Sequence, residues 1–136
     1  MSKISVLILQ PFTTKISGDF DHVIIPGVEG DFGVYAEHTP FITKIRPGIL
    51  QLFNEGSVQK YAIHDGFVTV DANLIRILCE TIEGMDEIDL SRAEAARQRA
   101  EKRMKETAEA DIDFRRAEVA LKKALVRIDL KKNESL

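Results

Sequence analysis

Glycine and proline stop at residue 84 of this 136-residue sequence, and that break limits the possible folds more than any other feature. All eight glycines and all four prolines lie in residues 1–84, and residues 85–136 contain none. Alanine shows the opposite distribution, with three before the break and nine after it. Because Gly and Pro favour tight turns and disfavour helix interiors, whereas Ala is the best helix former, the sequence predicts two parts of different architecture. We place the boundary at Gly84 to Glu87, giving domains 1–84 and 85–136.

The first part predicts short strands separated by closely spaced turns. Strands of this kind with no helices between them favour a flattened antiparallel β-sandwich or barrel. Eight segments are rich in Ile, Val, Leu, Phe and Tyr: Lys3–Gln10, Asp21–Ile25, Gly33–Tyr35, Phe41–Ile45, Ile49–Phe53, Gln59–His64, Phe67–Val70 and Leu74–Cys79.

The second part predicts an antiparallel pair of helices. Asp89 precedes a stretch without helix breakers that runs to Ala110, and Asp111 opens another that runs to about Lys131. Asp is a favoured N-cap, because its carboxylate accepts hydrogen bonds from the free backbone N–H groups of the first turn. The apolar seams repeat at three- and four-residue spacings: Leu90, Ala93, Ala96 or Arg97, Ala100 and Met104 on the first helix, and Phe114, Ala117, Leu121, Ala124 and Ile128 on the second. Such thin seams bury little area, so we expect a hairpin of marginal stability that docks on something or exchanges between states.

Charge and composition exclude several classes of function. The formal net charge is −3, which disfavours general binding to nucleic acid. Residues 1–85 hold six basic and ten acidic residues, and residues 86–136 hold thirteen and twelve, so most of the charge belongs to the predicted helices. The apolar runs are far shorter than the roughly 20 residues of a membrane span, and the N-terminal residues lack the pattern of a signal peptide. The chain has a single cysteine, Cys79, which cannot form an internal disulfide, as expected of a protein from a reducing compartment. We interpret Cys79 as a small buried hydrophobic residue.

No catalytic or metal site is predicted from the spacing of polar residues. His22, His38 and His64 are widely separated, without the close ligand pairs of zinc sites or a partnered nucleophile, so we interpret them as structural. The segment Gly27–Gly33 is glycine-rich, but neither a helix nor a Lys-Ser or Lys-Thr pair follows it. We therefore interpret it as turn geometry rather than a phosphate loop.

Basic residues of the predicted hairpin are the best candidates for a binding site. Arg92 and Arg99 are seven residues apart, two turns along one face of the first helix, and Lys123 and Arg127 are four apart near the end of the second. Guanidinium groups with interleaved carboxylates can hold the oxygens of a triphosphate. They can equally form a solvated helix face with internal ion pairs, and spacing alone favours that alternative.

Two motifs identify the chain as similar to a known family. Val28–Phe41 (VEGDFGVYAEHTPF) resembles the signature loop and strand of the epsilon subunits of bacterial F-type ATP synthases, and Ile88–Ala93 (IDLSRA) resembles their Ile/Leu-Asp-x-x-Arg-Ala motif. Gly66–Val70 and Asp111–Ala117 extend the resemblance over essentially the whole chain. It implies a flattened sandwich of about ten strands followed by a helical hairpin.

The resemblance also implies a non-catalytic part of a rotary motor. In the family the sandwich binds the gamma subunit and rests on the ring of membrane c subunits. Carried over to this chain, Glu29, Gly30 and Asp31 form the ring-facing loop, with His38 beside it. Charge complementarity there would fix register and partner choice. Glu37 departs from the family, which commonly has Gly at this position.

A regulatory role for the hairpin follows from the same resemblance. The family's hairpin either folds down on the sandwich or extends along gamma into the head, contacting alpha and beta subunits and blocking hydrolysis. In several relatives ATP, alone or with Mg, binds the folded-down form, and no other cofactor is implied. Lys123 stands where the best-studied pattern has Arg, which predicts weaker binding. The residues that match the ATP site are Glu83, Ile88, Asp89, Arg92, Ala93, Arg99, Lys123 and Arg127.

The resemblance further implies a location on the cytoplasmic face of the bacterial cell membrane, as a peripheral protein, and a role in proton transport and ATP synthesis. The alternative is a free-standing β-sandwich adaptor or small-ligand-binding protein, which would need a clustered site that the sequence does not show.

Overall fold

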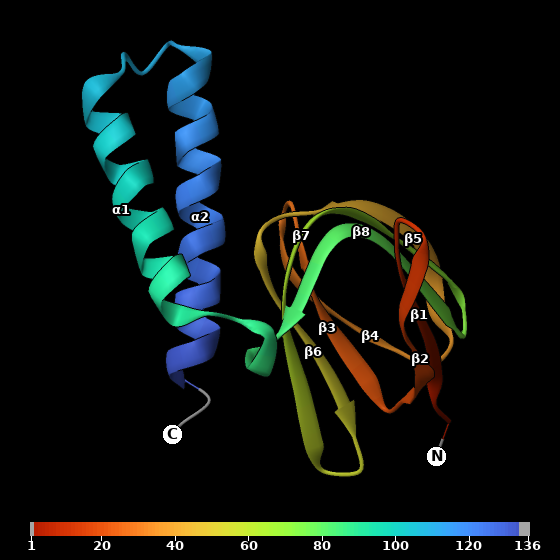
Figure 1. Cartoon of the computed structure of the whole chain (residues 1–136). Coiled ribbons are helices and arrows are strands. Elements are labelled where there is room, and N and C mark those ends of the chain that lie inside the picture. Colours follow the sequence, from red (N-terminus) through yellow and green to blue (C-terminus); the bar gives the residue numbers. More distant parts are fainter. Residues whose placement is uncertain (1, 134–136) are drawn as a thin grey trace. The chain divides into compact units, whose positions relative to one another are not determined.

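The computed structural model describes residues 2–133, without the side chain of His38. Within it the chain divides between Glu83 and Gly84 into two compact units, an all-β unit followed by a helical one. Figure 1 shows the strands in the first unit and the paired helices in the second. The sequence-based boundary of Gly84 to Glu87 lies at the same turn of the chain.

Eight strands, rather than about ten, build the β unit in the described residues. The sheet runs in the order β2-β1-β8-β7-β5-β3-β4, and β6 pairs with both β3 and β7, so that the sheet folds over on itself as a sandwich. The pair β1–β8 is parallel, unlike the antiparallel pairing expected of every strand. A long connection separates β1 from β8, so no short hairpin constrains their direction. The strands are β1 Ile4–Gln10, β2 Thr13–Phe20, β3 His22–Gly27, β4 Gly30–Tyr35, β5 His38–Ile45, β6 Gly48–Asn54, β7 Ser57–Ala72 and β8 Leu74–Gly84.

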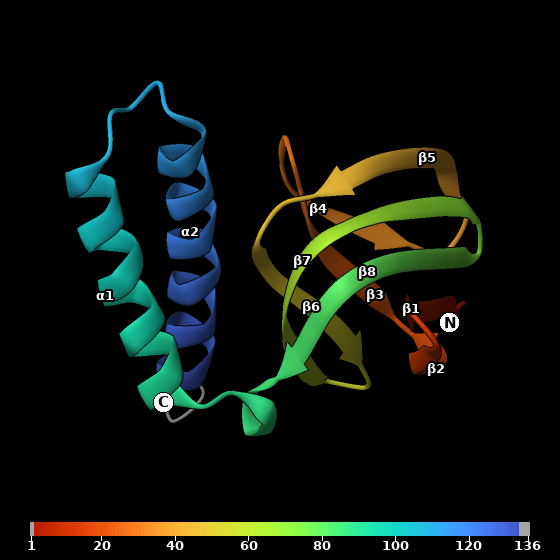
Figure 2. The same ribbon diagram turned by 45° about the horizontal axis from the view of Figure 1, so that its top comes forward.

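Strand β7 explains part of the difference in strand number, because it combines two predicted strands. Its first half pairs with β6 and its second half with β5, so one strand serves both layers. The bend falls at Asp65, whose φ is 60°, followed by Gly66. A Cβ on Gly66 would lie 2.3 Å from the carbonyl oxygen of Leu78, so only glycine allows β8 to approach so closely. Figure 2 shows the resulting curvature of β7 and β8.

Strand β2 was missed by the sequence analysis because it has no apolar run. It lies at the end of the strand order and pairs with β1, so only one of its edges carries a partner. Most of its side chains are exposed or half-exposed, and Phe20 is its one buried residue. An edge strand with one short contact to the core needs few apolar side chains.

The core of the sandwich consists of inward-facing aliphatic side chains from both layers. Side chains alternate along β6, since Leu50 and Leu52 are fully buried while Ile49, Gln51 and Phe53 are half-buried. The structural role assigned to His22 agrees with its position, stacked between Phe53 at 4.1 Å and Tyr35 at 4.7 Å. The remaining buried members include Ile4, Val6, Ile8, Val23, Ile25, Val34, Ile63, Val68, Ile75 and Ile77.

The helical unit contains a short 3-10 turn, η1 (Met85–Glu87), and two helices, α1 (Leu90–Glu106) and α2 (Ile112–Asn133). The sequence predicted a first helix that runs to Ala110, but α1 ends at Glu106. Thr107 adopts an extended conformation, and the Asp111 amide donates to the Ala108 carbonyl at 2.9 Å. The chain must leave the helix to reverse direction, and this turn makes the reversal without glycine.

Candidate functional site

Both predicted helix caps are present at the starts of α1 and α2. The Asp89 carboxylate accepts a hydrogen bond from the Arg92 amide at 3.1 Å, and Asp111 accepts one from the Asp113 amide at 2.8 Å. Before α1, the Glu87 carboxylate accepts from the Gly84 amide at 2.9 Å and fixes the turn η1. One oxygen of Asp89 is thus engaged in holding the helix, which limits what it can offer a ligand.

The two helices meet through small side chains. Ala93 and Ala100 of α1 and Ala117 and Ala124 of α2 are each no more than 5% exposed. The larger predicted members of the seams, among them Phe114 and Met104, are only half-buried. Ile88 and Leu130, near the linker end of the hairpin, are also buried, at 4% and 2% exposed. The seam itself consists of small side chains that each bury little apolar area, so the contact along it is thin, as the sequence indicated.

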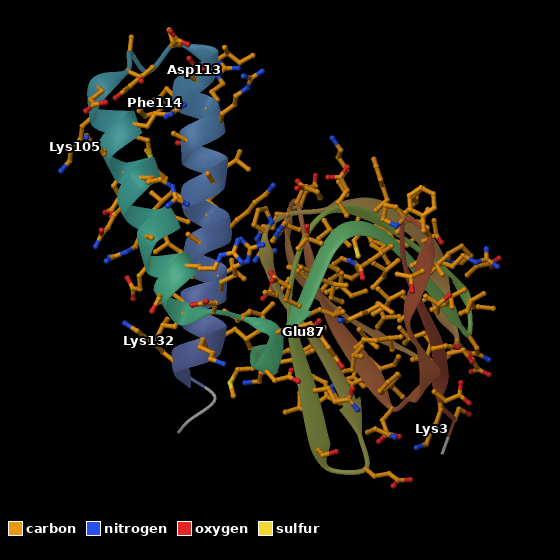
Figure 3. All side chains as sticks on the ribbon, viewed as in Figure 1. Lys3, Glu87, Lys105, Asp113, Phe114 and Lys132 are labelled. Carbon is orange, nitrogen blue, oxygen red and sulfur yellow. The ribbon has the colours of Figure 1, made fainter. Side chains whose placement is uncertain are left out.

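Two contacts near the linker set the antiparallel register of the hairpin. Lys132 forms an ion pair with Glu94 at 3.3 Å, and the Lys131 ammonium donates to the Met85 carbonyl at 2.9 Å. Figure 3 labels Lys132 at this end and Asp113 and Phe114 at the loop end. Counting five residues along each helix from the Glu94–Lys132 pair brings Arg99 level with Arg127.

A basic residue directly precedes each alanine of the seam. The pairs are Arg92-Ala93, Arg99-Ala100, Arg116-Ala117 and Lys123-Ala124. In two antiparallel helices, residues that precede their seam positions point to the same side of the pair, because reversing one helix mirrors its angular order. All four bases therefore share one flank. Arg103, Arg127 and these four define what we call the basic flank.

The opposite flank carries the acidic partners. Glu94 and Glu101 directly follow the seam alanines of α1, and Arg97 pairs with them at 3.0 and 3.9 Å. The cross-helix pair Glu94–Lys132 lies on this flank too. Ion pairing thus satisfies the acidic flank within the hairpin, whereas Arg92, Arg99 and Arg103 of the basic flank are exposed.

The structure therefore brings the four predicted bases onto one flank and adds two that the sequence analysis missed. Arg103 and Arg116 lie outside the two pairs, Arg92 with Arg99 and Lys123 with Arg127, whose spacing indicated a binding site. The repeated basic-Ala pair, seven residues apart within each helix, is the signal that could have found Arg116. Arg116 also pairs with Asp113 at 3.8 Å. Of the other predicted residues, Ile88 and Ala93 are buried, and Glu83 is the last residue of the β unit.

The predicted ring-facing loop is the tight turn between β3 and β4. Gly27 pairs with Gly30, whose φ of 131° suits glycine alone, so the segment is turn geometry as interpreted. Asp31 pairs with Arg46 at 2.6 Å, and Arg46 also donates to the Gly27 carbonyl at 2.8 Å. Of the two acids in the loop, Asp31 thus already has a basic partner, while Glu29 is exposed. The side chain of His38 lies outside the described residues.

Glu37 adopts a backbone conformation that favours glycine, although its side chain departs from that residue type. Its φ is 63°, in the left-handed region, and its amide donates to Asn73 Oδ1 at 2.6 Å. The turn thus forms with a glutamate at a position whose backbone conformation glycine adopts more readily.

Two further properties bear on the class of protein. Among the residues that the structure describes, no group of three or more His, Cys, Asp and Glu side chains could hold a metal ion. Within the same residues, no helix combines the length and apolarity needed to cross a bilayer. By fold, the chain is a β-sandwich followed by a charge-segregated helical hairpin.

Known protein families match both units of the chain. The ATP synthase Delta/Epsilon chain beta-sandwich domain matches residues 3–85, and the ATP synthase Delta/Epsilon chain long alpha-helix domain matches residues 86–132. The ATP synthase epsilon chain of Desulforamulus reducens is 40% identical over 121 residues, which cover 89% of this chain and 91% of that relative. The ATP synthase epsilon chain of an Exiguobacterium species is 38% identical over 132 residues, covering 96% and 97%.

A solved structure supports the fold. A chain of the Euglena gracilis mitochondrial ATP synthase, in an OSCP/F1/c-ring structure, superposes with a TM-score of 0.80 at 22% identity, covering 98% of this chain and 81% of that one. The family matches and the bacterial relatives confirm the resemblance drawn from the two motifs. The chain belongs to the ATP synthase delta/epsilon chain family.

Proposed function

We propose that the chain is a non-catalytic rotor subunit of a proton-translocating bacterial F-type ATP synthase. In this proposal the sandwich joins the gamma subunit to the c-ring, and the chain lies peripherally on the cytoplasmic face of the cell membrane. Family membership over both units supports it. A free-standing β-sandwich adaptor is the less favoured alternative, because it would leave the segregated charge of the hairpin without a role.

The hairpin would inhibit ATP hydrolysis by leaving its folded form and reaching the alpha and beta subunits. The observation that carries this proposal is the alanine seam, in which four small side chains make the central contact between the helices. A weak seam lets a partner with modest preference for the extended form shift the equilibrium. The exposed basic flank would then meet acidic surfaces of the head.

ATP would bias the hairpin toward its folded form by binding the basic flank. Arg99 and Arg127 are level across the two helices, so one triphosphate could contact both and hold α1 to α2. Magnesium would arrive on the triphosphate, because Asp89 already caps α1 and Asp113 pairs with Arg116. Such binding would involve no hydrolysis.

Deleting residues 85–136 tests the inhibitory role. We expect the ATP synthase complex to assemble with the shortened chain and to hydrolyse ATP severalfold faster than the complex with the full chain, because the blocking element is gone. ATPase assays on both purified complexes would measure this. Equal rates would contradict inhibition by the hairpin, and failure to assemble would contradict the role given to the sandwich.

A further inference from the structure

One arginine connects two turns at the same end of the sandwich. Arg46 lies in the turn between β5 and β6, and Val28 and Glu29 form the tip of the β3–β4 turn, because Gly27 pairs with Gly30 on either side of them. Two backbone hydrogen bonds of 3.0 Å join the turns, one from the Arg46 amide to the Pro26 carbonyl and one from the Val28 amide to the Lys44 carbonyl. They place the Arg46 side chain beside the base of the β3–β4 turn.

The Arg46 guanidinium spans that base. Its Nη1 donates to the Gly27 carbonyl at 2.8 Å, before the tip, and its Nη2 donates to Asp31 Oδ1 at 2.6 Å, after the tip. Guanidinium carries its N–H donors in a rigid planar fork, so it holds two acceptors in one geometry, whereas the ammonium of lysine is a compact charge on a flexible stem. Arg46 therefore fixes the two sides of the turn relative to each other.

The two residues at the tip point outward. Val28 is 51% exposed, and Glu29 is exposed as well. The Asp31 side chain is 54% exposed, but the Arg46 guanidinium offsets its charge. A tip that is already fixed loses little conformational entropy when it binds a partner, so this arrangement favours recognition. The ion pair itself is partly exposed and adds little to the stability of the sandwich, so folding alone does not explain it.

We propose that Arg46 is a positioning residue, which holds the β3–β4 tip so that Glu29, rather than Asp31, supplies the charge that a partner recognises. The partner surface would offer a basic side chain to Glu29 and an apolar contact to Val28, and the charge pair would set the orientation of binding. Asp31 would act through Arg46 without touching the partner. This role rests on the proposed function, in which the partner is the c-ring.

Rebinding to membranes tests the positioning role. The extramembrane part of the ATP synthase, assembled with the wild-type or a variant chain, is titrated onto membranes stripped of that part, which leaves the c-ring accessible. Arg46→Lys keeps the charge and loses the planar fork, so we expect the dissociation constant to rise about tenfold. Arg76→Lys, the same substitution at an exposed position of β8, is the matched control and should rebind as the wild type does.

A double-mutant cycle shows whether Arg46 acts through Glu29. Glu29→Gln should weaken rebinding about tenfold in the wild-type background. In the Arg46→Lys background the same change should cost about threefold or less, because an unfixed tip no longer holds Glu29 against the partner. Equal losses in the two backgrounds would overturn the positioning role, since a purely structural contribution of Arg46 is additive with the loss of Glu29.

Asp31→Asn distinguishes the two acidic residues. Asparagine keeps an oxygen that can accept from Arg46, so the tip should retain its shape and rebinding should weaken about threefold or less. A greater loss with Asp31→Asn than with Glu29→Gln would overturn the proposal in favour of direct contact by Asp31.

The outcomes separate this role from the proposed function. Rebinding by Arg46→Lys with wild-type affinity would overturn the positioning role and leave the proposed function standing. Thermal unfolding of the isolated full chain serves as the check on folding, and a clear loss of sandwich stability in Arg46→Lys would overturn the role in favour of a structural one. If the extramembrane part rebinds equally well without the chain, the proposed function itself is overturned.

Discussion

Single residues in this chain are constrained by backbone geometry as much as by packing. Gly66 and Gly30 sit where only glycine fits, one because β8 lies against it and one because its φ is 131°. Glu37 and Phe12 adopt positive φ without being glycine, at a cost of order 1 kcal/mol or more each. In that conformation the Glu37 amide donates a hydrogen bond to Asn73 Oδ1, whereas the Phe12 side chain is 107% exposed.

Cys79 makes the stability of the fold depend on pH above 9. It is 5% exposed, and burial raises the pKa of its thiol from 9.0 to about 11. Since the folded-state pKa lies above the unfolded one, this stabilisation is complete below pH 9 and is lost as pH rises through 11. Urea unfolding of the wild type and Cys79→Ala at pH 8 and pH 10 measures it. The difference in stability between the wild type and Cys79→Ala should be smaller at pH 10 than at pH 8. An unchanged difference would contradict the inference that burial disfavours the ionised thiolate.

Whole elements gain their properties from periodicity. The hairpin repeats a basic-Ala pair every seven residues within each helix, and the antiparallel arrangement places these bases on one flank. On the other flank Arg97 pairs with Glu94 and Glu101, so the acids are neutralised within the hairpin. The basic and acidic residues of the hairpin are nearly equal in number, but they lie on opposite flanks. The local excess of positive charge on the basic flank favours binding of an anion.

The basic flank should bind ATP through its arginines. Arg99→Ala and Arg92→Ala should each weaken ATP binding to the full chain about tenfold, or about 1.4 kcal/mol, because each removes a charge-assisted contact to phosphate. Lys123→Arg should strengthen it, since guanidinium can bind phosphate through two parallel hydrogen bonds. Calorimetry with millimolar ATP measures all three. Arg115→Ala, an exposed arginine outside the basic flank, is the control, and an equal loss there would indicate a general charge effect.

At the scale of the molecule, the two units differ in the internal packing that stabilises each of them. The sandwich has a continuous aliphatic core drawn from strands of both layers. The buried apolar residues described in the hairpin are four alanines with Ile88 and Leu130, and two caps and the contacts of Lys131 and Lys132 add to them. Its stability should therefore be lower and separate from that of the sandwich.

Thermal unfolding should occur in two steps. The helical circular dichroism signal near 222 nm should decrease at a lower temperature than the near-ultraviolet signal of the sandwich tyrosines, both of which lie in the β unit. ATP should raise the first transition and leave the second in place, because ligand binding stabilises only the unit that it contacts. One transition reported identically by both signals would show that the units unfold as one.

Most of the architecture was predictable from the sequence because it depends on local chemistry. The exclusion of Gly and Pro from residues 85–136 set the helical part, and Asp89 and Asp111 were identified as caps from their side chains alone. The edge strand β2 and the end of α1 at Glu106 were missed. Strand β2 depends on backbone pairing with β1, and the end of α1 depends on the reversal of the chain. Neither feature produces an apolar pattern in the sequence.

The sequence by itself determined the break at Gly84, the two classes of secondary structure and the family, since turn formers, helix formers and short motifs act through neighbouring residues. Only the tertiary structure decided that β7 bends at Asp65 to serve both layers, that Asp31 pairs with Arg46, and that the bases of two helices share one flank. The physical reason is that these properties join residues distant in sequence. Their positions follow from strand pairing and helix packing, which periodicity along one segment does not specify.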